Sequence, residues 1–113
     1  MFNYKVELAK QLDTILPAYY ELFVDSQSDF PCITYLELAN SADAEGDTLR
    51  YSSISFRIKI WGGDYAEIVE YVEPLDNLMF SLGFSRRAYN ELIESGMCQL
   101  IFTYTGMALE NNN

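Results

Sequence analysis

The stretch YSSISFRIKIWGGD, residues 51–64, indicates the fold class because it carries the clearest strand pattern in the chain. Its apolar side chains occupy alternate positions: Ile54, Phe56, Ile58 and Ile60. The positions between them are polar: Ser53, Ser55, Arg57 and Lys59. Since successive side chains of a strand point to opposite faces, this alternation predicts a strand from about Tyr51 to Trp61 with one apolar face.

The residues after this strand predict a turn and then a helix. The Gly-Gly pair at 62–63 interrupts the strand, and Asp64 followed by Glu67 has the spacing of a helix N-cap with an acid three residues later. The next apolar residues recur at helical spacing: Ile68, Val72, Leu75, Met79 and Leu82. Pro74 lies off this stripe and predicts a kink or a short break, and Gly83 is suited to the C-terminal cap.

The chain before the strand predicts one helix and two further strands. A helix is expected over 1–17, ended by Pro17, with an apolar stripe of Leu8, Leu12, Ile15 and Leu16. Strand patterns follow at 19–24 and 32–38. The polar stretch ANSADAEGDTLR, residues 39–50, predicts a long loop, and loops of this length in compact domains are usually functional or mobile.

Two more strands are predicted after the second helix. FSRRAY, 84–89, has strand character, whereas NELIESG, 90–96, fits either a turn or a strand extension. The stretch 97–106 predicts a last strand with inward Cys98, Leu100, Phe102 and Tyr104, and 107–113 is expected to be a loose tail. The order α-β-β-β-α-β-β over a single domain, 1–113, predicts an α+β fold: a mainly antiparallel twisted sheet with two helices packed on one face.

The composition suits a folded domain and limits what the protein can bind. The 113 residues are 50% hydrophobic, so the chain is long and apolar enough to bury a core. No apolar run approaches the roughly 20 residues that cross a membrane, and the N-terminus lacks the features of a signal peptide, so we expect a protein kept inside a cell. The formal charge of −10 disfavours tight nonspecific binding to nucleic acid, which depends on Lys and Arg.

The candidates for catalysis and metal binding are weak. The chain has no His, which removes the commonest general base and the usual zinc ligand. Asp43, Glu45 and Asp47 alternate as in a calcium loop, but the glycine comes too early and position twelve is Ile54, so a solvated loop is favoured. Three acids are expected on the solvated face of the second helix: Glu67, Glu70 and Glu73. We therefore expect no enzymatic activity, no metal and no cofactor.

The two cysteines, Cys32 and Cys98, lie in apolar segments with strand character. Their number allows a disulfide. Two buried free thiols agree better with a reducing compartment.

Four of the seven basic residues fall on two of the predicted strands: Arg57, Lys59, Arg86 and Arg87. One interpretation is a solvated outer sheet face whose charges protect an edge. The other is an interface, because a basic patch on an acidic protein can pair with the acidic surface of a second copy or of a neighbour. Under the second interpretation these four residues are candidate subunit contacts.

Several short motifs, taken in order, resemble the tail-completion or tail-terminator proteins of long-tailed phages and prophages. In that family a P-x-I-x-Y segment precedes a strand ending in Ile-Trp, and a helix leads to a Gly-Phe-x-Arg strand and a last strand closing near Tyr-x-Gly. The matching positions are Pro31, Ile33, Tyr35, Ile60, Trp61, Gly83, Phe84, Arg86, Tyr104 and Gly106. The resemblance spans nearly the whole chain and rests on the order and spacing of these motifs.

The resemblance implies a structural protein that caps the finished tail tube, stops its polymerisation and joins tail to head. It also implies a homo-oligomeric ring, a hexamer in this family, that meets the tail tube protein and the head connector or stopper protein. DNA would pass an acidic lumen without tight binding. The protein would occur in the host cytoplasm during assembly and at the tail–head junction of the virion. Loop 39–50, with Asp43, Glu45 and Asp47, is the expected partner-facing element.

Two alternative functions remain open at this point. A head-completion or stopper protein, or another neck component, would have a similar place in the virion. A small regulatory or ligand-binding module would instead be a monomer or dimer with an apolar pocket, and it would be absent from the virion.

Overall fold

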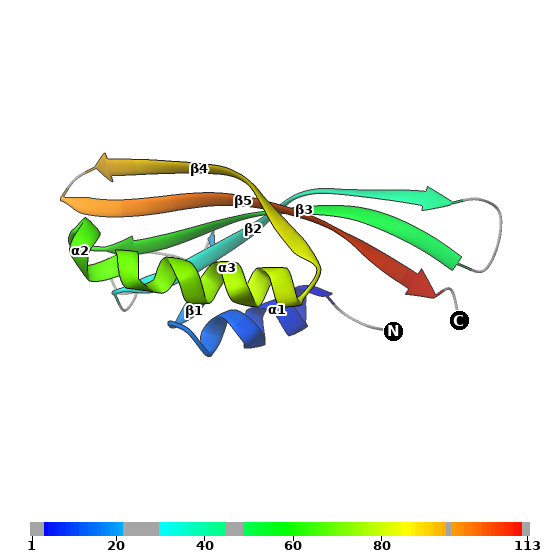
Figure 1. Ribbon diagram of the computed structural model, residues 1–113, viewed down its shortest axis with the longest axis horizontal. Coiled ribbons are helices and arrows are strands. Elements are labelled where there is room, and N and C mark those ends of the chain that lie inside the picture. Colours follow the sequence, from blue (N-terminus) through cyan, green and yellow to red (C-terminus); the bar gives the residue numbers. More distant parts are fainter. Residues whose placement is uncertain (1–3, 22–29, 45–48, 95, 112–113) are drawn as a thin grey trace.

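The computed structural model describes residues 4–21, 30–44, 49–94 and 96–111 (Figure 1). The helices are α1 (Tyr4–Asp13), α2 (Tyr65–Ile68) and α3 (Val72–Ser81), with a short 3-10 segment, η2 (Val69–Tyr71), between the last two. The strands are β1 (Ala18–Tyr20), β2 (Cys32–Ala44), β3 (Leu49–Gly62), β4 (Phe84–Glu94) and β5 (Met97–Asn111).

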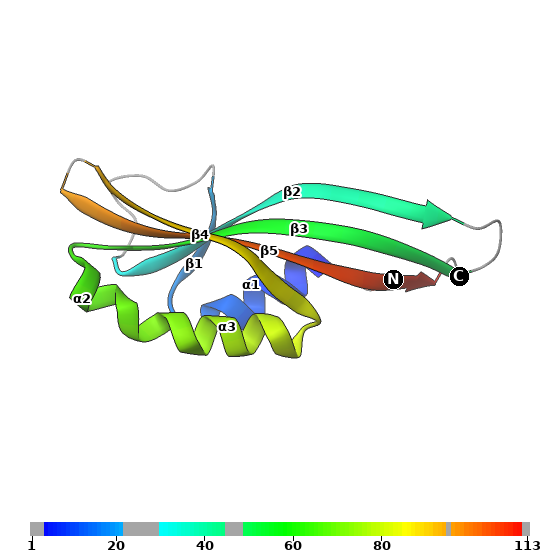
Figure 2. The ribbon, with the colours of Figure 1, turned by 45° about the horizontal axis from the view of Figure 1, so that its top comes forward.

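The strands form one twisted sheet in the order β1-β2-β3-β5-β4. β1 pairs with β2 in parallel, and the other neighbouring strands pair antiparallel. The helices lie together on one face of the sheet (Figures 1 and 2). The predicted α+β class, the order of elements and the placement of the helices are thus confirmed, with the second helix divided into α2, η2 and α3.

The core lies between the helices and the facing side of the sheet. The four alternating apolar residues of β3 are buried there, as are the four inward residues predicted for β5. The helices and the turn after α1 contribute Leu8, Leu12, Leu16, Ile68, Leu75 and Met79. Burial of these side chains stabilises the fold by roughly 25 cal/mol for each Å² of apolar surface removed from water.

The segment from β3 to α3 follows the predicted capping pattern. Asp64 Oδ1 accepts the backbone N–H of Glu67 at 2.8 Å, and Glu67 Oε2 accepts the N–H of Gly63 at 3.1 Å. The predicted break occurs as η2, just before Pro74 enters the first turn of α3. Proline has no N–H for the carbonyl four residues earlier, so the regular helical ladder is interrupted here. Gly83, with φ of +92°, follows the end of α3 as predicted.

The predicted polar loop at 39–50 is wrong for most of its length. Residues 39–44 continue β2 and pair with residues 50–55 of β3. The small polar side chains of this stretch have the composition of a loop, but strand propensity depends strongly on context, and here β3 supplies a complementary backbone. Asp43 is therefore a strand residue. The other two acids predicted to face a partner lie outside the described residues: Glu45 and Asp47.

The predicted loose tail at 107–113 is also wrong as far as Asn111. Residues 107–111 belong to β5 and pair with residues 49–53 of β3. Backbone N–H and C=O groups along β3 need partners, and the end of the chain supplies them. Residues 112–113 lie outside the described residues.

Three other boundaries differ in smaller ways. α1 ends at Asp13, and residues 14–16 form a turn before Pro17. The strand predicted at 19–24 is β1, Ala18–Tyr20, and residues 22–24 lie outside the described part of the chain. β4 continues to Glu94, so the ambiguous segment after Tyr89 is a strand extension.

β2, β3 and β5 continue past the helices as a three-stranded arm (Figures 1 and 2). We define the arm as residues 39–44, 49–53 and 107–111, in which β3 pairs with β2 on one side and with β5 on the other. The arm makes the molecule elongated, with principal extents of 51 × 25 × 21 Å. None of the described helices covers it.

Candidate functional site

The four cations predicted as one patch lie in two separate places. β5 runs between β3 and β4, so the β3 pair, Arg57 and Lys59, is not adjacent in the sheet to the β4 pair, Arg86 and Arg87. The β3 pair alternates with buried isoleucines and therefore points to the sheet face away from the helices. Arg86 instead reaches toward α3 on the helix side. The fold does not bring the two pairs together.

The β3 pair is held by a carboxylate of the same chain. Glu21, directly after β1, places one oxygen 2.7 Å from Arg57 Nη2 and the other 2.7 Å from Lys59 Nζ. Only 13% of the Glu21 side chain is exposed. Burial alone would raise the pKa of Glu21, but the hydrogen bonds and charges of Lys59 and Arg57 outweigh it and hold the pKa below its ordinary value of 4.5. The pair thus ties β1 to β3 across β2.

Two further contacts extend this cluster on the outer sheet face. Trp61 Nε1 donates to Thr34 Oγ1 at 2.9 Å, and Lys59 Nζ lies 5.4 Å from the centre of the Trp61 ring. Thr34 is fully buried, and its register partner in β3 is Lys59. Arg57 Nε is buried without a hydrogen-bond partner among the described residues. The Trp61 side chain therefore packs against Thr34 and Lys59. The β3 pair belongs to this same group of contacts on the outer sheet face.

Arg86 belongs to a network that links β4 and β5 to α3. Its guanidinium carbon lies 5.7 Å from the ring centres of both Tyr89 and Phe102, and Nη1 is 3.6 Å from Asp76 Oδ2. The other oxygen of Asp76 accepts the hydroxyl of buried Tyr104 at 2.6 Å. Burial and this hydrogen bond raise the pKa of Tyr104 far above its ordinary value, so the hydroxyl stays a donor.

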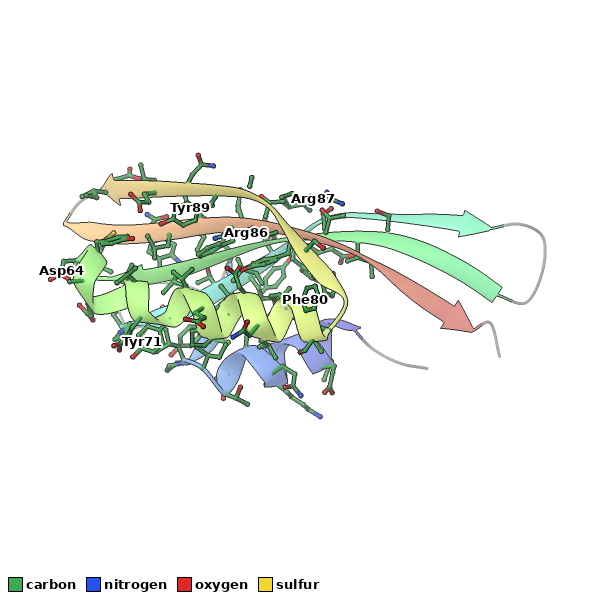
Figure 3. All side chains as sticks on the ribbon, viewed as in Figure 1. Asp64, Tyr71, Phe80, Arg86, Arg87 and Tyr89 are labelled. Atoms are coloured by element: carbon green, nitrogen blue, oxygen red, sulfur yellow. The ribbon has the colours of Figure 1, made fainter. Side chains whose placement is uncertain are left out.

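Arg87 differs from its neighbour in having no such network. The β4–β5 register shifts between Arg86 and Ala88, so Arg87 sits at a bulge. In Figure 3 its side chain points away from α3, whereas Arg86 lies on the helix side of the strand. Arg87 is exposed and forms no ion pair or side-chain hydrogen bond with the described residues. Of the four predicted contact residues, Arg87 is the one whose charge meets no carboxylate among the described residues.

The rest of β4 is exposed, although it is not uniformly polar. Every residue from Ser85 to Glu94 is accessible, and three of them are large and apolar: Tyr89, Leu92 and Ile93. The Tyr89 hydroxyl donates to Glu91 Oε1 at 2.6 Å. Partial burial and this hydrogen bond raise the pKa of Tyr89 above its ordinary range. β4 is thus an edge strand with accessible apolar and charged groups.

The acidic residues do not gather into a metal site within the described part of the chain. No group of three or more Asp, Glu or Cys side chains there is arranged to hold a metal ion. The predicted solvated face of the second helix is confirmed, because Glu67, Glu70 and Glu73 are all exposed.

The cysteines are two free buried thiols, Cys32 and Cys98, in agreement with the favoured prediction. Burial, with smaller contributions from Glu91 and Asp64, raises the pKa of the Cys98 thiol and disfavours its reactive thiolate form. Among the helices that the structure describes, none has the length and apolar character needed to cross a membrane.

Two features of this surface were missed by sequence reasoning. No sequence pattern links Glu21 to Arg57 and Lys59, which lie 36 or more positions away. Its ion pairs with them could therefore be found only from the fold. Leu92 and Ile93 were detectable, because they interrupt a polar stretch in an extended segment. Comparison with known proteins adds no family here, since no family model and no curated protein matches the chain.

Proposed function

We propose that the protein is a structural subunit of a phage or prophage tail that caps the tail tube, stops its polymerisation and joins tail to head. The observation that supports this proposal best is the shape of the sheet. Its arm extends past the described helices, and its β4 edge is accessible along the strand. Extended strands and open edges of this kind are suited to completion by neighbouring subunits.

The proposed assembly is a homo-oligomeric ring, with a hexamer as the expected size. A head-to-tail contact between identical subunits closes a ring when the rotation per subunit divides the circle. One face of the ring would cover the last layer of the tail tube, and the other would meet the head connector or stopper protein. The net charge of −10 agrees with a channel that DNA passes without tight binding.

The candidate contacts are ranked by their accessibility. Arg87 and the apolar residues of β4 are accessible, whereas the β3 pair is already bound to Glu21. Arg86 is held in its network with Asp76. The outer end of the arm, where β2 stops at Ala44 and β3 starts at Leu49, is the proposed partner-facing element.

Mass spectrometry of purified virions tests the proposal in the phage or induced prophage that carries the gene. We expect the chain in the particle, at a copy number that corresponds to one ring. Its absence from purified virions would overturn the structural function and would favour a regulatory or ligand-binding module.

Electron microscopy of a lysate from which the gene is deleted distinguishes the neck components. Overlong or unjoined tails are the result expected for a tail terminator. Leaking heads beside tails of normal length would identify a stopper or head-completion protein instead. Complementation with the intact gene is the matched control.

A further inference from the structure

β4 is a long, exposed edge strand whose backbone is open to pairing after its bulge. Its sequence, FSRRAYNELIE, contains neither the Pro nor the Lys that commonly protect exposed edges. The exposed fractions of Tyr89, Leu92 and Ile93 are 38%, 41% and 78%. One irregularity, the bulge between Arg86 and Ala88, lies near the start of the strand. The part after the bulge offers a regular backbone to a further strand.

The charges along β4 form two blocks of opposite sign. Arg86 and Arg87 lie near the beginning, and Glu91 and Glu94 lie near the end. A second β4 in antiparallel orientation would bring each basic block opposite an acidic one, and opposite charges across strands are favourable. A parallel arrangement would place like charges together. The charges of the strand therefore favour an antiparallel second copy over an in-register parallel one.

We propose that two copies of this chain pair through β4, antiparallel, about a two-fold axis at Asn90. This register places Ala88 opposite Leu92 of the second copy and brings Arg87, on the sheet face away from the helices, near Glu94 of the second copy. The backbone groups of both edges then find partners, and the exposed apolar residues gain cross-strand neighbours. An even register of this kind also keeps the helices of both copies on the same side of the joined sheet.

The occupant is a second copy, because the charges of the edge are complementary to those of an antiparallel copy of itself. A two-fold contact uses the same surface of both subunits, whereas a ring with two different faces needs two different surfaces. The pair therefore goes beyond the proposed function and describes the free protein before assembly. In that state it protects the two edges from other strands.

A charge exchange tests the pairing. Arg87→Glu and Glu94→Lys each turn two opposite-charge contacts of the pair into like-charge contacts, so each variant alone should dimerise at least about tenfold more weakly. An equimolar mixture of the two variants restores both contacts and should recover the dimer. Light scattering should report twice the chain mass of 13.0 kDa for the unaltered protein and for the mixture. Circular dichroism checks that each variant is folded.

The two variants also separate self-pairing from a contact between β4 and another acidic surface. In the second case Glu94→Lys would make β4 more basic and would strengthen association, while Arg87→Glu would weaken it. That result would overturn the proposal, and so would an unaltered protein that stays monomeric at millimolar concentration. A monomer would leave the proposed virion function intact, whereas virions without the chain would leave the dimer intact.

Cross-linking tests the position of the axis. Asn90→Cys should form a disulfide-linked dimer on mild oxidation, because the two introduced thiols face each other at the axis. Ser85→Cys, exposed on the same strand but far from the axis, is the matched control and should run as a monomer on a non-reducing gel. The native cysteines are buried and contribute little background. Equal cross-linking of both variants would exclude the proposed register.

Discussion

The β3 pair and the β4 pair contain the same kinds of side chain on strands of the same sheet, yet their surroundings differ. Arg57 and Lys59 share one carboxylate, Glu21, at 2.7 Å from each cation. Arg86 stacks near aromatic rings, and Arg87 meets no carboxylate among the described residues. The cations of β3 therefore hold the protein's own segments together, while the β4 edge keeps an accessible charge.

This difference follows from the positions of the strands. β3 is central, so a segment next to β1 can reach across its outer face and bring a carboxylate. β4 is the last strand of the sheet, and its neighbour on one side is β5. A cation at a sheet centre finds partners within the chain more readily than one at an edge, where solvent and other molecules compete.

The largest loss of stability is expected for Gly106→Ala, which would displace the start of β4. A Cβ at this position would lie 2.6 Å from the carbonyl oxygen of Gly83 and 2.8 Å from Phe84 Cδ1. Because the first contact is with backbone, the strand must shift, at a cost of about 2–3 kcal/mol. Urea denaturation measures the change. Gly63→Ala is the control, since a Cβ there meets only the flexible end of Glu67, and equal stability of both variants would contradict the prediction.

Glu21→Ala should have the next largest effect on stability, because it removes the carboxylate that binds both cations of the β3 pair. Removing the carboxylate leaves two partly buried cations side by side without their hydrogen-bond acceptor. We expect the free energy of unfolding to fall by about 2 kcal/mol in chemical denaturation. Glu73→Ala, which removes an exposed acid from α3, should change it by less than about 0.5 kcal/mol. A loss no larger than that of the control would show that the cluster does not stabilise the fold.

Acid should remove the stabilising contribution of the Glu21 carboxylate from the unaltered protein. The pKa of Glu21 is lower in the folded chain than its ordinary value of 4.5. Its charge therefore stabilises the fold above pH 4.5, and this contribution is lost as the pH falls through the lower folded pKa. The difference in unfolding free energy between the unaltered protein and Glu21→Gln should be constant near neutral pH and should shrink below pH 4.5. A difference that grows on acidification would contradict the sign of the shift.

Tyr104→Phe should cost less, because it removes one hydrogen bond and leaves the ring in the core. We expect a loss of about 1 kcal/mol, since Asp76 is partly exposed and can turn to water or to Arg86. Tyr89→Phe removes an equally short hydrogen bond at the exposed edge and should cost less than about 0.5 kcal/mol. Thermal unfolding compares the two variants. Equal losses would mean that burial of the bond has no influence.

Arg87→Ala should have the smallest effect on the stability of the single chain, below about 0.5 kcal/mol, because the side chain is exposed. Arg57→Ala removes a contact to Glu21 and should cost more in the same denaturation experiment. These two variants compare the stabilising contribution of a β4 cation directly with that of a β3 cation. If Arg87→Ala destabilised the monomer as much as Arg57→Ala, the two cation pairs would not differ as described.

Periodicity predicted the parts of the fold that depend on local sequence. The alternation in β3, the helical stripe from Ile68 to Leu82 and the Asp64 cap all follow from contacts within a few residues, and all are confirmed. The stripe of the first helix is confirmed for Leu8 and Leu12, whereas Ile15 and Leu16 lie in the turn after α1. The arm was missed because residues 39–44 have no strand pattern of their own and become a strand by pairing with β3. Composition alone does not show which distant backbone is available.

For the candidate contact residues, too, local spacing was predictable and distant pairing was not. That Arg57 and Lys59 share a face was predictable from strand geometry, because it depends on spacing alone. Their bond to Glu21 and the separation of the two pairs by β5 depend on strand order, which no local pattern encodes. Whether any of these residues touches a partner stays a prediction.

The pairing of β3 with β5 has a consequence for how the chain is made. β3 ends at Gly62, but its second neighbour begins at Met97 and is the last strand in the sequence. During synthesis one side of the β3 backbone therefore stays unpaired until β5 leaves the ribosome. Contacts between such distant segments slow folding and prolong the exposure of aggregation-prone strands. A premature stop codon before β5 would leave the central strand of the sheet as an edge.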